Sequence, residues 1–400
     1  MSNDKRGASM DFKDKTLNLH LGLKGKIEVI SRATLNTKED LSLLYSPGVA
    51  YPCLEIAKDA QKSYLYTRRH QMIAVITDGS AVLGLGDIGA QASMPVMEGK
   101  AILFKTLADV DAFPICIDSK DINDIVKTIT LLQHSFGGIN LEDISAPRCF
   151  EIEEKLKKSL DIPVFHDDQH GTAIVVGAAL INALKLTHKS LNNIKVVING
   201  IGAAGQAITR FLLHLGVKTL VLCDRFGILS QDDQNLRQDH KIILELIKKD
   251  HKKGTLTDAL DEADVFIGVS AKDCLTSDMI KKMKKNPIIF AMANPDPEIL
   301  PNDAYKAGAF IVGTGSSKYE NQINNVLAFP GIFKGTLDAK AKQITLGMME
   351  AACHAIARYV KPSQLSAHHI LPNPLDLNLH KAVSTSVYYY AITHNIEQTH

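Results

Sequence analysis

Four acidic side chains are spaced so that they could hold a metal ion. Asp167 and Asp168 follow a short β-branched and aromatic run at residues 162–165, and Glu142 and Asp143 follow the start of another apolar strand. Carboxylates that converge without basic partners repel each other unless a cation lies among them, and oxygen ligands favour magnesium or manganese over zinc. Glu142, Asp143 and Asp168 are therefore candidate metal ligands. The alternative is that Asp167 and Asp168 only cap the helix that follows them.

Two further residues have side chains that could move a proton. Lys100 directly precedes an apolar helical run, and a lysine that is desolvated or faces a cation can lose its proton near neutral pH and act as a base. Tyr45 ends a predicted helix over residues 37–44, because Pro47 disfavours helix before it and Gly48 permits a turn. Its phenol could point into a cleft, although packing is the more common role of such a tyrosine.

A glycine-rich turn predicts a dinucleotide site. Gly200, Gly202 and Gly205, with Ala203 and Ala204 between them, form a GxGxxG motif. A predicted strand over 194–198 precedes the motif, and a predicted helix over 206–215 follows it. In this context the glycines let the backbone approach a pyrophosphate at the start of the helix.

The second strand of the predicted βαβ unit, residues 219–222, leads to an acidic residue. Asp224 lies nineteen residues beyond Gly205, where a carboxylate would accept hydrogen bonds from the ribose hydroxyls and repel a 2′-phosphate. This predicts NAD as the cofactor. The neighbouring Arg225 leaves NADP possible.

Strands and helices alternate along most of the chain, as in a doubly wound parallel sheet. Strands are predicted over 26–30, 72–77, 111–118, 263–269, 288–293 and 309–312, and helices over 122–136, 148–160, 173–186, 336–359 and 377–392. Asn294 follows one of these strands, and Asn324 and Asn325 lie in a predicted loop. Their amides could reach a substrate carboxylate, although a turn role is as common. The last two helices are expected to pack back on the N-terminal part.

The composition predicts an ordinary globular protein that binds small molecules. The chain has 400 residues, 45% hydrophobic and 22% charged, with a net charge of +1, so no nucleic-acid or membrane partner is expected. The six cysteines form no disulfide or zinc pattern, which predicts a cytoplasmic location. We expect a flexible tail at 1–14, an N-terminal domain at 15–160 and a nucleotide-binding domain at 161–400.

Eight segments together carry a family resemblance. They are YSPGVA, LGLGDIG, PVMEGKAILFK, LEDI, FHDDQHGTA, NGIGAAG, ANPDP and NNVLAFPG. In this order and spacing, from about residue 26 to residue 391, the chain resembles the malic enzyme family of the short bacterial type. The resemblance implies an α/β fold, with an N-terminal malic-enzyme domain and a Rossmann-type doubly wound NAD(P)-binding domain. It also implies a homodimer.

The resemblance further implies oxidative decarboxylation of L-malate to pyruvate and carbon dioxide, with NAD or NADP and magnesium or manganese. It assigns metal ligation to Glu142, Asp143 and Asp168. It assigns the general base to Lys100, with Asp167 as its partner, and the general acid to Tyr45. Asn294 would contact both cofactor and malate, and the other malate contacts would come from Tyr45, Lys100, Asn324 and Asn325, with Asn325 preferred to Asn324.

One position departs from the family pattern. Larger eukaryotic members have an arginine that clamps a substrate carboxylate where this chain has Ala81. Backbone amides of the turn at residues 79–81, or a basic residue elsewhere, could substitute. Other functions also stay open on this scaffold: a non-redox oxaloacetate decarboxylase, a malolactic-type enzyme, or a nucleotide sensor without catalysis. The presence of Tyr45, Lys100 and the three acids argues against the sensor.

Overall fold

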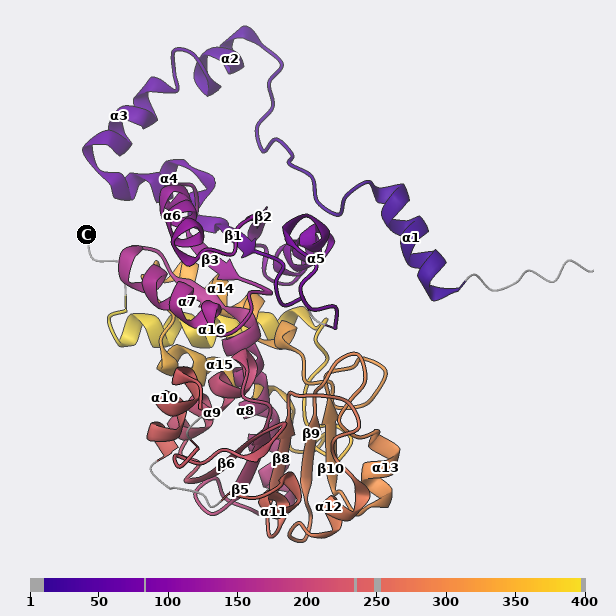
Figure 1. Cartoon of the computed structure of the whole chain (residues 1–400). Coiled ribbons are helices and arrows are strands. Elements are labelled where there is room, and N and C mark those ends of the chain that lie inside the picture. The colour runs from indigo at the N-terminus through magenta and orange to yellow at the C-terminus, as the bar shows by residue number, and fades with distance from the viewer. Residues whose placement is uncertain (1–10, 83, 234–235, 248–252, 397–400) are drawn as a thin grey trace, which may run out of the picture.

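The strands of the described residues form two sheets (Figure 1), in a computed structural model that describes residues 11–82, 84–233, 236–247 and 253–396. The first sheet is parallel, in the order β2-β1-β3-β4. It contains β1 (Met72–Thr77), β2 (Asp111–Cys116), β3 (Gly138–Leu141) and β4 (Val164–His166).

The second sheet has the order β10-β9-β8-β5-β6-β7 and is parallel except for β7 at its edge. It contains β5 (Lys195–Asn199), β6 (Thr219–Asp224), β7 (Gly227–Ile228), β8 (Val265–Gly268), β9 (Ile288–Ala291) and β10 (Ile311–Thr314). The chain runs outward from β5 in both directions. This reversal of strand order opens a crevice at the carboxyl ends of the strands, where doubly wound sheets bind ligands.

The helices fall into three groups along the chain. The N-terminal group is α1 (Phe12–Leu23), α2 (Lys38–Leu44), α3 (Ala50–Lys58) and α4 (Ser63–Tyr66). The helices of the first sheet and the central helix are α5 (Ala90–Ala108), α6 (Ile122–Leu132), α7 (Arg148–Ser159) and α8 (Asp167–Thr187). The remaining helices are α9 (Ala203–His214), α10 (Gln238–Ile247), α11 (Leu256–Leu260), α12 (Ser277–Lys281), α13 (Pro301–Lys306), α14 (Phe329–Asp338), α15 (Leu346–Tyr359) and α16 (Leu377–Thr393).

The alternation of side chains along each strand divides the core into layers. In β1, Ile73 and Val75 face a central core, whereas Ala74 and Ile76 face a second core under α6 and α7. Since side chains of a strand point alternately to opposite faces, a strand buried on both faces must be apolar throughout. This is why β1 has no polar residue before Thr77.

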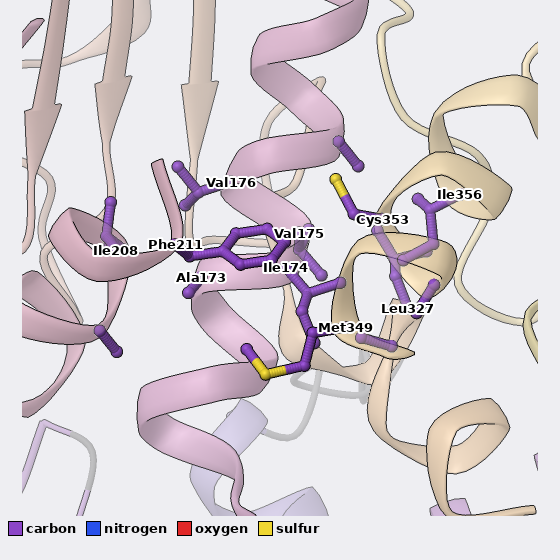
Figure 2. Close-up of a cluster of buried hydrophobic side chains, with 14 of the residues drawn as sticks. Ala173, Ile174, Val175, Val176, Ile208, Phe211, Leu327, Met349, Cys353 and Ile356 are labelled. Carbon is purple, nitrogen blue, oxygen red and sulfur yellow. The ribbon is translucent and has the colours of Figure 1, made fainter. Parts of the chain in front are cut away.

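Helix α8 joins the two sheets through the central core. Its residues Ala173 to Val176 pack against Phe211 of α9 and against Met349 and Cys353 of α15 (Figure 2). By length and composition α8 could cross a membrane, yet 72% of its apolar window is buried inside the fold. A core helix that is apolar on all sides has the same composition. Strand β4 ends at His166 and α8 begins at Asp167, so the pairing of β4 in the first sheet and the packing of α8 in the central core together fix the start of this helix.

The predicted α/β fold, with a Rossmann-type parallel sheet in the second half, is confirmed, and three local predictions are wrong. Residues 26–30 form no strand, because they run along the surface without a pairing partner. The helix predicted over 336–359 is two helices, α14 and α15, separated by residues 339–345. The helix predicted to start at Ala173 begins at Asp167, so both aspartates lie in its first turn. Helices α14 and α16 contact α5 of the first sheet.

The N-terminal arm, residues 12–58, extends away from both sheets (Figure 1). None of the residues in α1, α2 or α3 is buried, although Leu43, Tyr51 and Leu54 are large and apolar. Helix α2 is held locally by a capping box between Thr37 and Asp40. Residues 1–10 of the predicted tail lie outside the described part of the chain, and α1 begins at Phe12, within the predicted tail.

Candidate active site

Four carboxylates meet at one edge of the first sheet. Strands β3 and β4 are parallel neighbours, so the residues that follow them leave the sheet side by side. Glu142 and Asp143 follow β3, and Asp167 and Asp168 follow β4. Ligand atoms of Glu142, Asp143 and Asp168 lie within 4.8 Å of one another. The Asp143 amide also donates to Asp168 Oδ2 at 2.7 Å, which ties the two turns together.

Lys100 enters this cluster from α5. Its Nζ lies 2.6 Å from Asp167 Oδ2 and 2.8 Å from Glu142 Oε1, and it lies 4.1 Å from the centre of the Phe329 ring. Lys100 is buried, and Asp167 is fully buried. A buried lysine needs such partners, because an unpaired charge in the interior is very costly. The structure therefore brings together the predicted base, its predicted partner and the predicted metal ligands.

The electrostatics of the cluster are dominated by crowded negative charge. Burial raises the pKa values of Glu142, Asp167 and Asp168 above their usual ranges, although Lys100 opposes the rise. Burial by itself lowers the pKa of Lys100, but Asp167 and Glu142 outweigh it, so the pKa of Lys100 is raised. The cluster therefore contains one ammonium, that of Lys100, and four carboxylates, those of Glu142, Asp143, Asp167 and Asp168. The all-oxygen donor set and the excess negative charge fit a hard divalent cation.

The predicted asparagines differ in their contacts. Asn324 Oδ1 accepts the Val326 amide at 3.0 Å, so its side chain caps a short turn. Asn325 packs against Gly171 in the first turns of α8, since a Cβ placed on Gly171 would lie 3.1 Å from Asn325 Cβ and 1.9 Å from Asp167 Oδ1. These contacts favour Asn325 over Asn324 as the residue beside the carboxylates.

The two halves of the site meet at loops. Asn294 follows β9, and a Cβ on Gly84 of the LGLG segment would lie 3.9 Å from the Asn294 carbonyl carbon. The first domain's glycine loop therefore lies against the loop of Asn294, as required if one small molecule is to touch both. Leu83 lies outside the described residues.

The amides of the turn at residues 79–81 are already bonded within the protein, which argues against the first of the two predicted substitutes for the missing arginine. The Gly79 amide donates to Thr77 Oγ1, the Ser80 amide to Asp78 Oδ1, and the Ala81 amide to the Asp143 carbonyl. Each donor is already satisfied. A basic residue does lie beside this turn: Arg148 pairs with Asp78 at 2.7 Å and donates to Ser80 Oγ.

Tyr45 is the predicted catalytic residue that the structure does not bring into the cluster. It is the C-terminal cap residue of α2 on the N-terminal arm, and 69% of its surface is exposed. Lys100, in contrast, is 7% exposed in the body of the first domain. The helix end at Tyr45 is as predicted, but its surroundings depend on whatever covers the arm.

The glycine motif adopts the geometry of a nucleotide-binding turn. Gly200 has a φ of +104°, which only glycine adopts easily, and Gly202 is the N-terminal cap of α9. A Cβ on Gly205 would lie 1.9 Å from the Gly200 carbonyl oxygen, whereas a Cβ on Gly202 would meet nothing within 4 Å. Gly205 thus serves close packing of strand and helix, and Gly202, Ala203 and Ala204 leave the helix start open to a phosphate.

Asp224 ends β6 and lines a cavity of about 410 Å³ beside this turn, together with Asn199, Arg225, Phe226, Ser270 and Cys274. Asp224 Oδ1 accepts the Phe226 amide at 2.7 Å, and the Arg225 guanidinium lies 4.7 Å from the centre of the Phe226 ring. Asp224, which favours NAD, and Arg225, which leaves NADP possible, therefore line the same cavity.

Sequence reasoning missed the buried polar residues that support the site. Glu298 is fully buried and accepts the Ser270 and Ala293 amides, so it links the loops after β8 and β9. Glu153 of α7 contacts Gln169 and His170 behind the turn that carries Asp167 and Asp168. No clear sequence signal pointed to them, because Glu153 lies in a strongly charged helix and Glu298 in a proline-rich loop, so their burial is seen only in the structure.

Two family models match the chain almost end to end. Residues 24–157 match the malic enzyme N-terminal domain, and residues 169–392 match the malic enzyme NAD-binding domain. The bifunctional malic/malolactic enzyme of Bacillus subtilis is 53% identical over 379 residues, covering 94% of this chain and 92% of that protein. The NADP-dependent malic enzyme of Rhizobium meliloti is 46% identical, covering 92% of this chain but 50% of that protein.

Solved structures show the same fold over nearly the whole chain. The NAD-dependent malic enzyme from Thermotoga maritima superposes with a TM-score of 0.90 at 50% identity, covering 93% of this chain and 98% of that chain. A malic enzyme from Entamoeba histolytica superposes with a TM-score of 0.92 at 35% identity, covering 97% and 83% of the two chains. With its motifs in order and its lysine and carboxylates gathered at one sheet edge, the chain belongs to the malic enzyme family.

Proposed function

We propose that the chain oxidatively decarboxylates L-malate to pyruvate and carbon dioxide, using NAD or NADP and a divalent metal. The observation that carries the proposal is the position of Lys100, whose Nζ lies within 2.8 Å of both Asp167 and Glu142 beside three carboxylates that can share one ion. A base next to an oxygen-ligand metal site, in a chain that also has a dinucleotide-binding turn, suits the oxidation of a 2-hydroxy acid.

Glu142, Asp143 and Asp168 would hold the metal, which we propose to be magnesium or manganese because the donors are all oxygen. When bound, the cation would polarise the substrate's C2 oxygen and stabilise negative charge that develops there. Lys100 would take the proton of the C2 hydroxyl, and a bound nicotinamide would supply the hydride acceptor. Asp167, which accepts a hydrogen bond from Lys100 Nζ, would orient that side chain.

Lys100 has to be neutral to act as a base. Among the groups of the protein, Asp167 and Glu142 raise the pKa of Lys100 and favour its charged form. Carboxylates whose charge is shared with a divalent cation hold a neighbouring ammonium less strongly. We therefore propose that metal binding at Glu142 and Asp168 prepares Lys100 for proton transfer.

Tyr45 is the proposed general acid, which protonates C3 after carbon dioxide departs. Its exposure on the N-terminal arm means that this role needs a covering partner, and we propose a second copy of the chain. The arm buries no residue of α1, α2 or α3 and displays Leu43, Tyr51 and Leu54, as in a segment that packs against another subunit. In this homodimer, Tyr45 of one copy would serve the lysine of the other.

NAD is the proposed cofactor, with NADP possible. Asp224 would accept hydrogen bonds from the ribose hydroxyls, while Gly200, Gly202, Ala203, Ala204 and Gly205 hold the pyrophosphate. Arg225 lies over the Phe226 ring, and Asp224 lines the cavity beside it. Relatives named for NAD and for NADP both match the chain, so the preference rests on these side chains.

Asn294 and Asn325 are the proposed amide contacts to the substrate. Asn294 lies where the loop of the NAD-binding domain meets Gly84, and Asn325 lies beside Asp167 across Gly171. Arg148 is the proposed source of positive charge near Ala81, although its pairing with Asp78 already uses part of that charge.

We propose the domains as predicted, 15–160 and 161–400, with β4 at the start of the second domain contributing to the sheet of the first domain. The proposed location is the cytoplasm.

A second candidate is the malolactic reaction, which converts malate to lactate and carbon dioxide without net oxidation. The relative from Bacillus subtilis, 53% identical to this chain, is named a bifunctional malic/malolactic enzyme. The same lysine and carboxylates would serve, provided that the reduced cofactor stays bound and returns its hydride to the ketoacid. Nothing in the site favours the non-redox decarboxylase or the sensor over these two reactions.

One assay decides among these functions. The purified chain is incubated with L-malate, manganese and either NAD or NADP, while reduced cofactor is followed by absorbance and pyruvate and lactate are measured. Malic enzyme activity gives reduced cofactor and pyruvate in equal amounts. Lactate without reduced cofactor identifies the malolactic reaction. No turnover of malate with either cofactor would overturn the proposal.

A further inference from the structure

A buried chain of polar side chains lies behind the metal-binding turn. Glu153 of α7 is buried and pairs with His170 Nε2 at 2.7 Å and with Lys157 Nζ at 2.7 Å. Its other oxygen, Oε2, lies 3.2 Å from Gln169 Nε2. The same Gln169 Nε2 lies 2.6 Å from Nδ1 of His166, which is fully buried at the end of β4. The proposed reaction uses none of these five residues of the turn and of α7.

The contacts determine which nitrogen of His166 carries the proton. A carboxylate next to a basic side chain accepts hydrogen bonds, so the Gln169 atom beside Glu153 must be the amide NH₂. That NH₂ also faces His166 Nδ1, and two donors cannot face each other at 2.6 Å. Nδ1 therefore accepts. The ring is neutral and its proton lies on Nε2.

His166 Nε2 faces a proposed metal ligand. It lies 3.5 Å from Asp168 Oδ2, and it has no hydrogen-bond partner among the described residues. Asp168 Oδ2 also accepts the Asp143 amide at 2.7 Å. Asp168 Oδ2 thus accepts one hydrogen bond, from the Asp143 amide, and His166 Nε2 faces the same oxygen at 3.5 Å without completing a second.

We propose that His166 is a positioning residue for the metal ligand Asp168, with its Nε2 proton fixed by Gln169 and Glu153. The carboxylate is then held in one orientation before the cation arrives. Partners behind a metal ligand commonly have this effect, and their loss typically weakens metal binding by about 10- to 100-fold. The inference rests on the proposed metal site, and it adds a role for residues that touch neither substrate nor ion.

The test measures manganese binding to the full-length protein, from the electron paramagnetic resonance signal of free Mn²⁺. His166→Phe keeps a buried ring of similar size without donors, and we expect Mn²⁺ to bind about 10- to 100-fold more weakly. His166→Gln returns an amide donor near the Nε2 position and should recover most of the affinity. His380→Phe is the matched control, because His380 is equally buried but bonds to the Pro374 carbonyl instead.

A spectroscopic measurement tests the proton position directly. In protein labelled with ¹⁵N-histidine, the ring-nitrogen resonances that disappear in His166→Gln belong to His166, and they should be those of a neutral ring protonated at Nε2. Gln169→Met removes the group that selects this form, so we expect a mixture of the two neutral forms and weaker Mn²⁺ binding. A His166 ring protonated at Nδ1 in the wild type would overturn the proposal.

Failure of the inference and failure of the metal site give different results. If Asp168→Asn binds Mn²⁺ as tightly as wild type, the proposed site itself is wrong. If Asp168→Asn loses binding while His166→Phe and Gln169→Met keep wild-type affinity, only the positioning role is wrong. Thermal unfolding without metal identifies a variant that fails to fold, and the remaining variant and the nitrogen resonances then decide.

Discussion

At the scale of single residues, the same carboxylates could serve two tasks: they stabilise the Lys100 ammonium, and they could bind a metal cation. Asp167 and Glu142 stabilise the Lys100 ammonium, yet Glu142 also belongs to the group of carboxylates that can bind a cation. Because Glu142 can contact both Lys100 and a metal, its charge links metal binding to the protonation state of Lys100. Changes to individual acids and bases should therefore have separable effects on metal binding and on proton transfer.

Replacing Asp168 with asparagine should remove a charge from the three-carboxylate site. We expect Mn²⁺ to bind at least about 100-fold more weakly, which is more than loss of a supporting group costs, and malate turnover to be abolished at moderate metal concentration. Because Asp168 is partly exposed, the fold should remain intact. Metal titration and thermal unfolding check both expectations. Wild-type turnover by this variant without added metal would contradict the assignment.

Variants of the two proposed proton-transfer residues, Lys100 and Tyr45, should be impaired at different steps of the reaction. Lys100→Ala should slow both malate oxidation and ketoacid reduction by about 10²–10⁴-fold, since both exchange a proton at the C2 oxygen. Tyr45→Phe should lose pyruvate formation from malate but keep much of the reduction of oxaloacetate, because C3 protonation follows hydride transfer. Malate oxidation, ketoacid reduction and oxaloacetate decarboxylation are measured on both variants. Equal losses in all three assays would contradict this division.

The acidic residue at the cofactor cavity should set the cofactor preference. Wild type should prefer NAD, and Asp224→Ser should shift the ratio of kcat/KM toward NADP by roughly tenfold or more, since hydrogen bonds to charged groups contribute about 1.5–3 kcal/mol. Arg225 would then be free to meet the 2′-phosphate. An unchanged ratio would show that Asp224 does not touch the ribose.

At the scale of secondary-structure elements, the turn between β5 and α9 separates packing from ligand binding. Gly205 has a backbone oxygen 1.9 Å from where its Cβ would be, and Gly202 has open space. The same substitution at these two positions therefore has different consequences.

Gly205→Ala should destabilise the protein by about 1–3 kcal/mol, because the strand and helix must move apart. Gly202→Ala should leave the unfolding temperature close to wild type but weaken NAD binding, because its methyl group occupies the approach of the pyrophosphate. Thermal unfolding with and without NAD measures both effects. If Gly202→Ala is stabilised by NAD as strongly as wild type, the pyrophosphate does not bind there.

At the scale of the whole molecule, the exposed N-terminal arm predicts that the active site needs two copies of the chain. Mixing Tyr45→Phe protein with Lys100→Ala protein, after dissociation and reassociation, should restore activity although each variant alone is inactive. Random pairing should give about a quarter of wild-type activity, because half the dimers are mixed and each has one complete site.

The control for this experiment mixes Tyr45→Phe with the double variant Tyr45→Phe/Lys100→Ala, which offers no intact tyrosine. No recovery is expected there. If the first mixture also stays inactive while mixed dimers are present by mass spectrometry, Tyr45 acts within its own chain, and the arm must fold back in solution.

Much of the fold followed from local patterns. The βαβ unit with GIGAAG was predictable because its signals, an apolar strand, closely spaced glycines and a helix, lie within thirty residues. The convergence of Glu142, Asp143 and Asp168 was predictable because parallel strands place their carboxyl ends at one edge. In both cases, backbone geometry converts sequence spacing into spatial proximity.

Local patterns failed where long-range contacts decide the structure. Residues 26–30 alternate like a strand but have no partner to pair with, and the apolar periodicity over 336–359 hides the interruption between α14 and α15. The turn at residues 79–81 bonds its own amides to Asp143 and other neighbours, which no pattern within the turn reveals.

By itself, the sequence determined the α/β class, the nucleotide-binding turn and the candidate acids and base, since each depends on residue type and spacing along the chain. The family resemblance suggested that Lys100 bonds to Asp167, sixty-seven residues away, and that Asn325 rather than Asn324 lies beside this pair, and the tertiary structure shows both contacts. Only the tertiary structure showed that Tyr45 is exposed. The reason is physical: burial and partner choice depend on how separate elements pack, and packing is a property of the whole core.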